Sequence, residues 1–346
     1  MDTPGITLSQ RLQRAWLKRG LLAVSLLPLA LLFGGLAALN RLMYRIGLIG
    51  SHTLAVPVVV VGNLIAGGAG KTPTVMAIVE LLRRSGFTPG IISRGYGRAG
   101  QDVIDVHANT AAAQCGDEPL LMKLRCCAPV CVGRDRVAAA RELLRLHPSV
   151  NIIVSDDGLQ HRRLARTAQV LVFDERGAGN GWLLPAGPLR ERVPAAVPER
   201  SVVLYNAPMA STPLRGTLAR RSLRGVVALQ AWRSGQVSSS SSLASLRGRT
   251  VVAAAGLAHP DRFFSMLREL GLIITALPLP DHFDYQTLPW PTETADVVVT
   301  EKDAVKIDPS RLGRTRVWVA ALDFSLDTEF ETALLALLPA PPLPRN

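Results

Sequence analysis

The sequence has few aromatic residues and few cysteines for its length. Phe, Trp and Tyr make up 5% of the 346 residues and are scattered, which argues against a protein that binds nucleic acid by stacking bases. No histidine pair follows the four cysteines at zinc-finger spacing, and two of them are adjacent, an arrangement that does not easily form a disulfide. We therefore expect reduced thiols in a cytosolic protein at Cys115, Cys126, Cys127 and Cys131.

Acidic residues are also scarce relative to basic ones. The chain has 27 Asp and Glu against 39 Lys and Arg, a formal charge of +12 and a sequence pI of about 10.4. Such a balance favours anionic partners, and the shortage of aromatics makes anionic lipid or a phosphorylated substrate a better expectation than nucleic acid. A hydrophobic content of 48% excludes a disordered chain, and the length predicts two domains.

Charge is absent altogether from residues 20–39, which are almost uniformly apolar. This stretch could just span a bilayer of about 30 Å, and a cleaved signal peptide is a further alternative. Pro28 and the pair Gly34-Gly35 interrupt it, and cations at both ends could meet anionic headgroups: Arg11, Arg14, Lys18, Arg19, Arg41 and Arg45. We therefore predict a membrane-associated helix over residues 1–45 that lies in the interface or inserts shallowly.

From residue 56 onward short apolar runs alternate with helical patterns. Strands are predicted at 58–61, 90–93, 152–154 and 170–173, and helices at 72–84 and 135–146. Strands that alternate with helices indicate an α/β fold with a parallel sheet and helices on both faces. We assign residues 46–176 to one such core domain.

A stretch rich in glycine and proline follows, at residues 177–200. We predict a hinge there, with Arg190 and Glu191 coupling its closure to the nucleotide. A second, smaller α/β domain is expected over 201–346, with strands at 201–204, 225–229, 251–255, 273–275 and 297–300. The serine run 238–242 is predicted to be a solvated loop and the proline-rich tail 339–344 an extended segment.

The strand predicted at 58–61 leads directly into a glycine-rich loop, and the helix predicted at 72–84 begins at the end of this loop. This is the context of a P-loop, in which backbone N–H groups and the helix N-terminus surround phosphate oxygens. Lys71 would neutralise the β- and γ-phosphates, and the Thr72 hydroxyl would bind Mg²⁺. The strict pattern has a glycine at position 65, where this chain has Ile65, so two later glycines take over the turn. The predicted phosphate-binding residues are Gly67, Gly68, Ala69, Gly70, Lys71 and Thr72.

A P-loop enzyme also needs a metal-binding carboxylate at the tip of a neighbouring strand. The apolar run 152–154 leads into Asp156, Asp157 and a glycine turn. We predict that one of these acids holds Mg²⁺ directly or through water, with Glu118 as a further candidate ligand through water.

Three other classes of protein fit the sequence less well than a P-loop kinase does. A GTPase needs a guanine-reading Asn/Thr-Lys-x-Asp, and residues 300–303 have those letters in the wrong spacing. Partitioning-type ATPases often carry a lysine where this chain has Ala66. A membrane scaffold would have no use for paired metal-binding acids. The residues alone thus leave a kinase and another membrane-associated P-loop ATPase of unknown substrate.

Eight short motifs in fixed order narrow this choice. The series resembles the tetraacyldisaccharide 4′-kinase family, the lipid A 4′-kinases of Gram-negative bacteria, over residues 11–306, with Leu159 where that family is expected to have Phe. The motifs are Gly-Gly-Ala-Gly-Lys71-Thr-Pro, Ser93-Arg-Gly-Tyr-Gly-Arg98, Gly116-Asp-Glu-Pro119, Val132-Gly-Arg-Asp-Arg136, Asp156-Asp-Gly-Leu-Gln-His161, Pro185-Ala-Gly-Pro-Leu-Arg-Glu191, His282-Phe-Asp284 and Thr300-Glu-Lys-Asp-Ala-Val-Lys306.

The resemblance implies a reaction, its cofactors and its place in the cell. The enzyme would use ATP and Mg²⁺ to phosphorylate the 4′-hydroxyl of a tetraacyldisaccharide 1-phosphate, giving the lipid A precursor lipid IVA. It would work at the cytoplasmic face of the inner membrane, attached by the N-terminal helix.

Phosphoryl transfer to a sugar also requires a group that accepts the hydroxyl proton. We predict Asp117 as that base, with His282 orienting it or sharing the proton, so that the pair forms when the two domains close. Arginines in loops after strands suit bidentate phosphate contacts, and the candidates are Arg94, Arg98, Arg134 and Arg136. Gln160 and His161 are predicted to support the Asp156-Asp157 turn.

Overall fold

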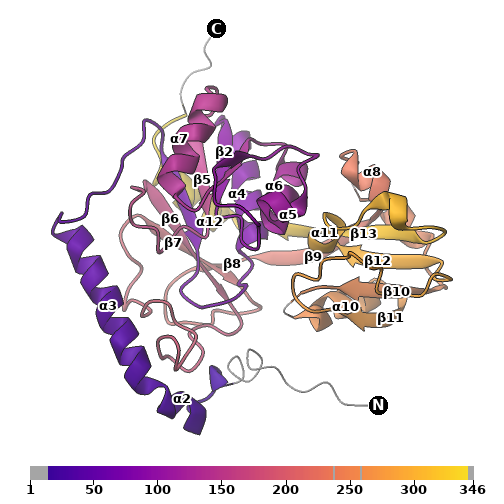
Figure 1. Cartoon of the computed structure of the whole chain (residues 1–346), viewed down its shortest axis with the longest axis horizontal. Coiled ribbons are helices and arrows are strands. Elements are labelled where there is room, and N and C mark those ends of the chain that lie inside the picture. The colour runs from indigo at the N-terminus through magenta and orange to yellow at the C-terminus, as the bar shows by residue number, and fades with distance from the viewer. Residues whose placement is uncertain (1–14, 237, 258, 342–346) are drawn as a thin grey trace.

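A computed structural model describes residues 15–236, 238–257 and 259–341. Within these ranges the chain forms two lobes, each built on its own sheet, and a helical segment that projects from the first lobe on the side away from the second (Figure 1). Most of the basic N-terminal stretch and the end of the proline-rich tail, both predicted from the sequence, lie outside the described residues.

The first lobe contains a sheet of eight strands in the order β3-β4-β2-β5-β1-β6-β7-β8. All neighbours pair in parallel except β3, which is antiparallel to β4. The strands are β1 (Val58–Gly62), β2 (Pro89–Ser93), β3 (Ile104–Asp105), β4 (Val130–Val132), β5 (Ile152–Asp156), β6 (Ala168–Asp174), β7 (Ser201–Asn206) and β8 (Thr217–Leu218).

Helices cover both faces of this sheet, as the sequence predicts. Successive residues of a strand point to opposite faces, so Val59 and Val61 pack on one side of β1 while Val58 and Val60 pack on the other. The first face is covered by α4 (Lys71–Arg84), α6 (Asp117–Cys126) and α12 (Thr328–Leu335), and the second by α7 (Arg136–Leu146). The short helix α5 (Ala112–Cys115) precedes α6.

The second lobe contains a sheet of five strands in the order β11-β10-β12-β13-β9, in which only β9 runs antiparallel. Its strands are β9 (Arg220–Ala228), β10 (Thr250–Ala255), β11 (Ile273–Pro278), β12 (Asp296–Thr300) and β13 (Arg316–Ser325). Its helices are α8 (Leu229–Arg233), α9 (Ser240–Ala244), α10 (Pro260–Glu269), α11 (Glu301–Ala304) and the 3₁₀ turn η1 (Pro309–Arg311).

The predicted domain boundary at residue 201 is wrong. β7 pairs in parallel with β6 and therefore belongs to the first sheet, where five of its six residues are buried. The chain enters the second lobe at Ala219, between β8 and β9, and returns after β13 to place α12 against the first sheet. An apolar strand after a glycine- and proline-rich segment looks the same in the sequence whether it extends a sheet or starts one.

The segment 177–200 is also not the linker between the lobes, because it joins two neighbouring strands of one sheet. It packs over the glycine-rich loop: the Ala66 N–H donates to the Pro188 carbonyl oxygen (2.7 Å), and the Arg190 N–H donates to the Leu64 carbonyl oxygen (2.7 Å). Its glycines and prolines shape an irregular cover for the loop. The serine run likewise differs from its prediction, since α9 begins within it and Ser239 caps that helix.

The apolar N-terminal segment forms two helices, α2 (Leu21–Ser25) and α3 (Leu27–Arg45), with the break just before Pro28. α3 is long and apolar enough to cross a membrane, with a mean hydropathy of 1.4, and only 6% of it is buried. Its large side chains are exposed, including Leu31 (71%) and Leu36 (60%). Such an exposed apolar surface suits membrane association, either as a spanning or as an interfacial helix.

The four cysteines are free thiols. Three of them lie in the core of the first lobe, where burial raises the pKa of Cys115 to about 11 and those of Cys126 and Cys131 to about 12. Only Cys127 is exposed. The three buried thiols therefore behave as apolar core residues.

Candidate active site

The glycine-rich loop leaves the buried strand β1 and ends at the first residue of α4. Gly67 (φ +92°) and Gly70 (φ +82°) have left-handed backbone conformations that other residues adopt only with strain. The space next to the Cα of Gly68 is open. Lys71, the first residue of α4, lies with its Nζ 3.2 Å from Asn63 Oδ1 and 3.5 Å from Asp157 Oδ1. This is the strand, loop and helix arrangement of a P-loop.

Three side chains that the sequence analysis did not single out hold this loop in place. The buried Asn63 donates to the Gly67 carbonyl oxygen (3.2 Å). Asn206, at the end of β7, donates to the Ala69 carbonyl oxygen (3.0 Å), and Arg176 donates to that of Gly68 (2.8 Å). Asn63 directly precedes the loop and could have been found, but the other two are over 100 residues away in sequence.

The two consecutive acids lie beside Lys71 in different electrostatic states. Asp156 is fully buried, and desolvation, reinforced by the charge of Glu118, raises its pKa to about 7. Burial also opposes ionisation of Asp157, but the charges of Lys71 and Arg190 outweigh it and hold its pKa below the usual range. Arg190 donates to both Asp157 oxygens (3.1 and 3.3 Å). The surroundings of Asp157 therefore favour its ionised form, whereas burial disfavours ionisation of Asp156.

These residues fit a bound Mg²⁺ and a nucleotide phosphate. Asp156 Oδ1 is buried without a hydrogen-bond partner, while Oδ2 accepts from the Ser93 hydroxyl (2.9 Å). A cation near Oδ1 would satisfy that oxygen and lower the pKa of the carboxyl. No three His, Cys, Asp or Glu side chains converge within the described ranges, so the ion would take Asp156 or Asp157 together with Thr72, phosphate oxygens and water.

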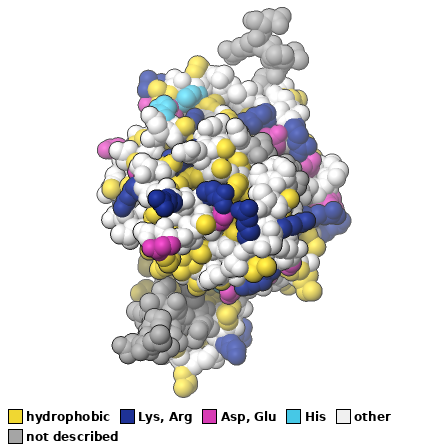
Figure 2. Space-filling view, turned by 90° about the vertical axis from the view of Figure 1, so that its right-hand side faces the viewer, with side chains coloured by type: hydrophobic (Ala, Val, Ile, Leu, Met, Phe, Trp, Pro, Cys, Tyr) yellow, Lys and Arg dark blue, Asp and Glu magenta, His cyan; other side chains and the backbone are white. Residues whose placement is uncertain are grey.

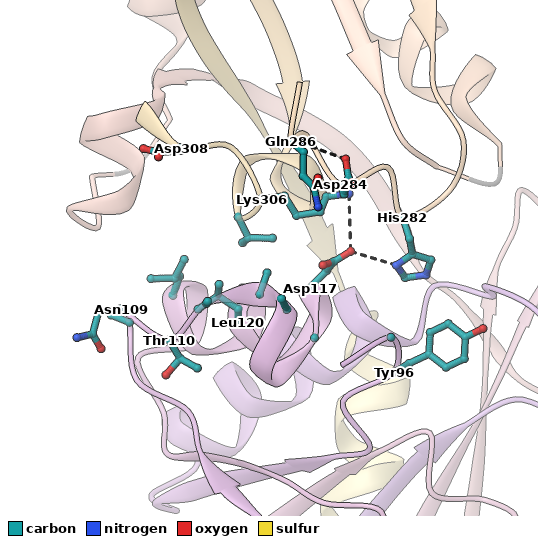
Figure 3. Close-up of a pocket in the computed structure, with 18 of the residues that line it drawn as sticks. Tyr96, Asn109, Thr110, Asp117, Leu120, His282, Asp284, Gln286, Lys306 and Asp308 are labelled. Carbon is teal, nitrogen blue, oxygen red and sulfur yellow. Dashed lines mark hydrogen bonds and ion pairs between the residues drawn. The ribbon is translucent and has the colours of Figure 1, made fainter. Parts of the chain in front are cut away.

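Asp117 and His282 are in contact, although 165 residues separate them. His282 Nδ1 lies 3.0 Å from Asp117 Oδ2, so an N–H at this atom would donate to the carboxylate. Asp117 opens α6 in the first lobe, and His282 lies in the loop after β11 in the second lobe (Figure 3). The Tyr96 ring lies 5.6 Å from the His282 ring, centroid to centroid.

Two lysines of the second lobe reach the first turn of α6. Lys306 Nζ is 3.7 Å from Asp117 Oδ2, and Lys302 Nζ is 3.7 Å from Glu118 Oε1. Burial raises the pKa of Asp117, but the hydrogen bond from His282 and the charges of Lys306, His282 and Lys302 lower it by more, so the net pKa is below the usual range. Both lysines lie in the motif 300–306, to which the sequence analysis gave no chemical role.

The arginines predicted to bind phosphate do not form one cluster. Arg136 is buried and donates to the carbonyl oxygens of Gly133 (3.0 Å) and Asp156 (3.4 Å), so it supports the end of β5. Arg98 donates to the Asp102 carbonyl oxygen within its own loop. Arg94 and Arg134 are exposed, and they alone of the four are free to reach a ligand.

The remaining predicted residues support the loop that carries the acids. The Gln160 amide donates to the Asn63 carbonyl oxygen (3.4 Å) and accepts from Arg190 (3.3 Å). His161 Nε2 accepts a hydrogen bond from the Arg136 backbone N–H (3.3 Å). Glu191 pairs with Arg162 (2.6 Å), which lies in the same loop as Gln160 and His161.

A cleft of about 790 Å³ opens between the lobes beside Asp117 and His282. Its floor comes from α5 and α6 and its opposite wall from the second lobe, which contributes Asp284, Gln286 and Lys306 (Figure 3). Glu118, adjacent to Asp117, is close enough to Asp156 to raise its pKa. The site can thus hold a nucleotide at the P-loop and a second substrate in the cleft, with a carboxylate between them.

Comparison with known proteins identifies the fold and the family. A family model described as tetraacyldisaccharide-1-P 4′-kinase matches residues 22–339. The chain is 55% identical over 337 residues to the tetraacyldisaccharide 4′-kinase of Methylibium petroleiphilum, covering 96% of this chain and 94% of that protein. It is 53% identical to the enzyme of the same name from Leptothrix cholodnii, covering 96% and 97%.

The chain belongs to the tetraacyldisaccharide 4′-kinase family. A solved member, LpxK from Aquifex aeolicus in complex with ATP, is similar with a TM-score of 0.75 and 26% identity, over 92% of this chain and all of that one. The family, the kinase class and the fold class predicted from the sequence are confirmed, and the kinase is favoured over an ATPase of unknown substrate.

Proposed function

We propose that this chain transfers the γ-phosphate of ATP to the 4′-hydroxyl of a tetraacyldisaccharide 1-phosphate, giving lipid IVA, at the cytoplasmic face of the inner membrane. The observation that carries the proposal is the contact between Asp117 and His282 (3.0 Å) at the edge of the cleft between the lobes. Family membership supports the reaction, and the exposed apolar surface of α3 supports a lipid substrate.

Asp117 is the proposed proton acceptor. Its depressed pKa keeps it ionised at neutral pH, ready to take the proton of the sugar hydroxyl as the hydroxyl oxygen attacks. His282 orients the carboxylate through Nδ1 and shares the proton. Lys71 neutralises charge that builds up on the transferred group. ATP with Mg²⁺ supplies the phosphoryl group, held by the P-loop, Thr72 and Asp156 or Asp157.

A transfer assay with radiolabelled γ-phosphate tests the reaction. A disaccharide 1-phosphate lipid should become labelled, whereas free sugar should not, and hydrolysis by water should be slow. Lys71→Ala should reduce the rate by at least about 10²-fold, the usual cost of deleting one electrostatic stabiliser. Near-normal turnover of Lys71→Ala would contradict the nucleotide assignment.

A double-mutant cycle tests the proton-handling pair. Asp117→Ala and His282→Ala should each reduce turnover strongly, and the double variant should lose little more than the worse single one, because the two side chains act as a unit. Nucleotide affinity should barely change in any of the three. Additive losses would show that the two residues act independently, and His282 would then be assigned a role in substrate binding.

A further inference from the structure

We propose that a pocket lined by arginines at the end of α3 binds the phosphate group of a membrane lipid. The pocket has a volume of about 470 Å³ and is separate from the cleft beside Asp117. α3 contributes Arg41, Tyr44 and Arg45, and the loop before β6 contributes Arg162 and Arg166. We call this set the arginine pocket.

The arginine pocket has more positive charge than its acidic neighbours balance. Within the described part of the chain its one acidic partner is Glu191, which pairs with Arg162 (2.6 Å) and Arg41 (3.5 Å). Four arginines against one carboxylate leave an excess of three positive charges. Arg45 has no ion-pair partner among the described residues.

The guanidinium group of Arg166 is held in the pocket by neutral hydrogen-bond acceptors. It donates to the carbonyl oxygens of Leu159 (3.1 Å) and His161 (3.4 Å) and to the side chain of Gln169 (3.3 Å). Burial, together with the charge of Arg162, lowers its pKa to about 10. A guanidinium that is partly removed from water without an anionic partner costs free energy, and an anion bound in the pocket would offset that cost.

The position of the pocket indicates a ligand carried by a lipid. It adjoins the last turn of α3, whose preceding turns present exposed leucines. A tyrosine and arginines at the end of an apolar helix are typical of the headgroup level of a membrane, and basic pockets there bind lipid phosphates. By contrast, on the end of the molecule formed by the second lobe, the cations lie scattered among neutral and acidic side chains (Figure 2).

A lipid phosphate could come from two sources. One is the headgroup of a bulk anionic phospholipid, and the other is the 1-phosphate of the acceptor, which rests on the proposed function. Both present phosphate oxygens, to which arginine guanidinium groups donate bidentate hydrogen bonds in the same way.

Vesicle binding of the full chain tests the site. Arg41→Gln/Arg45→Gln changes two exposed side chains of α3, so folding is not at risk, and Arg311→Gln/Arg314→Gln removes the same charge from exposed positions of the second lobe. Binding is measured on phosphatidylcholine vesicles with and without about one-fifth phosphatidic acid. The pocket variant should lose about 25-fold in affinity for the anionic vesicles only, at roughly fivefold per arginine, and the control should change less than about twofold.

Transfer to the acceptor in neutral detergent micelles separates the two sources. If the acceptor phosphate occupies the pocket, the pocket variant should raise the KM about tenfold for the phosphorylated acceptor and leave an acceptor without the 1-phosphate unaffected. If bulk lipid occupies it, the vesicle effect should appear with an unchanged KM. A pocket variant that matches the control in both assays overturns the proposal. Absence of transfer by the wild type would instead contradict the kinase function and leave the vesicle result standing.

Discussion

Lys306 is the lysine of the second lobe that most strongly favours the ionised form of the proposed base, Asp117. Its side chain is 4% exposed, and its Nζ lies 3.2 Å from Asp303 Oδ1 as well as 3.7 Å from Asp117 Oδ2. The Tyr285 ring lies 5.3 Å from the same nitrogen. Asp303 is itself fixed by the Thr300 hydroxyl and the Gly256 N–H. The buried cation therefore lies between the carboxylates of Asp303 and Asp117.

Replacing this lysine should alter the pH dependence of the reaction. In Lys306→Met the pKa of Asp117 should rise, because a cation that favours its ionised form is lost. The acidic limb of the rate profile should then move to higher pH by roughly 1–2 units, so the relative loss of rate should grow as the pH falls and vanish near neutral pH. Rate profiles that extend from neutral pH down into this acidic limb, with melting curves to verify folding, measure this effect.

Lys302→Met is the matched control for this change. Lys302 pairs with Asp281 (3.0 Å) and Glu118 and is a weaker influence on Asp117 than Lys306. Its removal should move the acidic limb less. Profiles of the same shape in the wild type and in Lys306→Met would rule out the electrostatic role of Lys306.

At the scale of single elements, α3 stands apart from the two lobes. Ala30 is the one buried residue of α3. The helix contacts the first lobe at Gly34, whose backbone approaches Leu183. The chain before it is anchored by Trp16, whose indole N–H donates to the Pro185 carbonyl oxygen (2.9 Å), and by Arg19, which donates to that of Asn180 (3.1 Å). The helix thus adds little to the core of the first lobe.

Deleting residues 1–40 should leave a folded catalytic part. Nucleotide binding should be unchanged, whereas activity on acceptor in membranes should fall at least tenfold, because the apolar surface that meets the bilayer is gone. Thermal unfolding with and without nucleotide, and transfer to acceptor in vesicles and in micelles, measure the two effects. A truncated chain that does not fold would show that the segment is part of the core.

At the scale of the whole molecule, the lobes are joined by packing as well as by the chain. One continuous apolar core includes strand residues of both sheets, such as Val61 of β1 and Val319 of β13. Arg125 of α6 also crosses between the lobes and pairs with the buried Glu301 of α11 (3.1 Å). Trp232 and the Leu322 N–H donate to the same carboxylate.

Arg125→Ala should weaken the contact between the lobes. Burial raises the pKa of Glu301, and Arg125 is the strongest group that opposes this. We expect a loss of roughly 1–2 kcal/mol in the free energy of unfolding, since a buried carboxylate keeps two hydrogen bonds but loses its ion pair. Denaturant unfolding measures this loss, and Arg84→Ala, which breaks an exposed pair with Glu331, is the control and should change stability by less than about 0.5 kcal/mol. Equal stability of Arg125→Ala and wild type would mean that the apolar core alone joins the lobes.

The sequence by itself determined the local features of this protein. The P-loop, the Asp156-Asp157 turn and the alternation of strands and helices depend on residues close in the chain, where backbone geometry and side-chain chemistry are set by neighbours. The apolar N-terminal helix is likewise a property of one continuous segment. The order of the motifs then predicted the family and, through it, the pairing of Asp117 with His282.

Only the tertiary structure decided which distant segments lie together. β7 follows a glycine- and proline-rich stretch that looks like a linker, yet it extends the first sheet and brings Asn206 to the P-loop. Lys306 reaches Asp117 only because the motif that carries it folds at the end of β12, facing α6. Strand order and contacts between lobes depend on packing across long chain separations, which no pattern of neighbouring residues records.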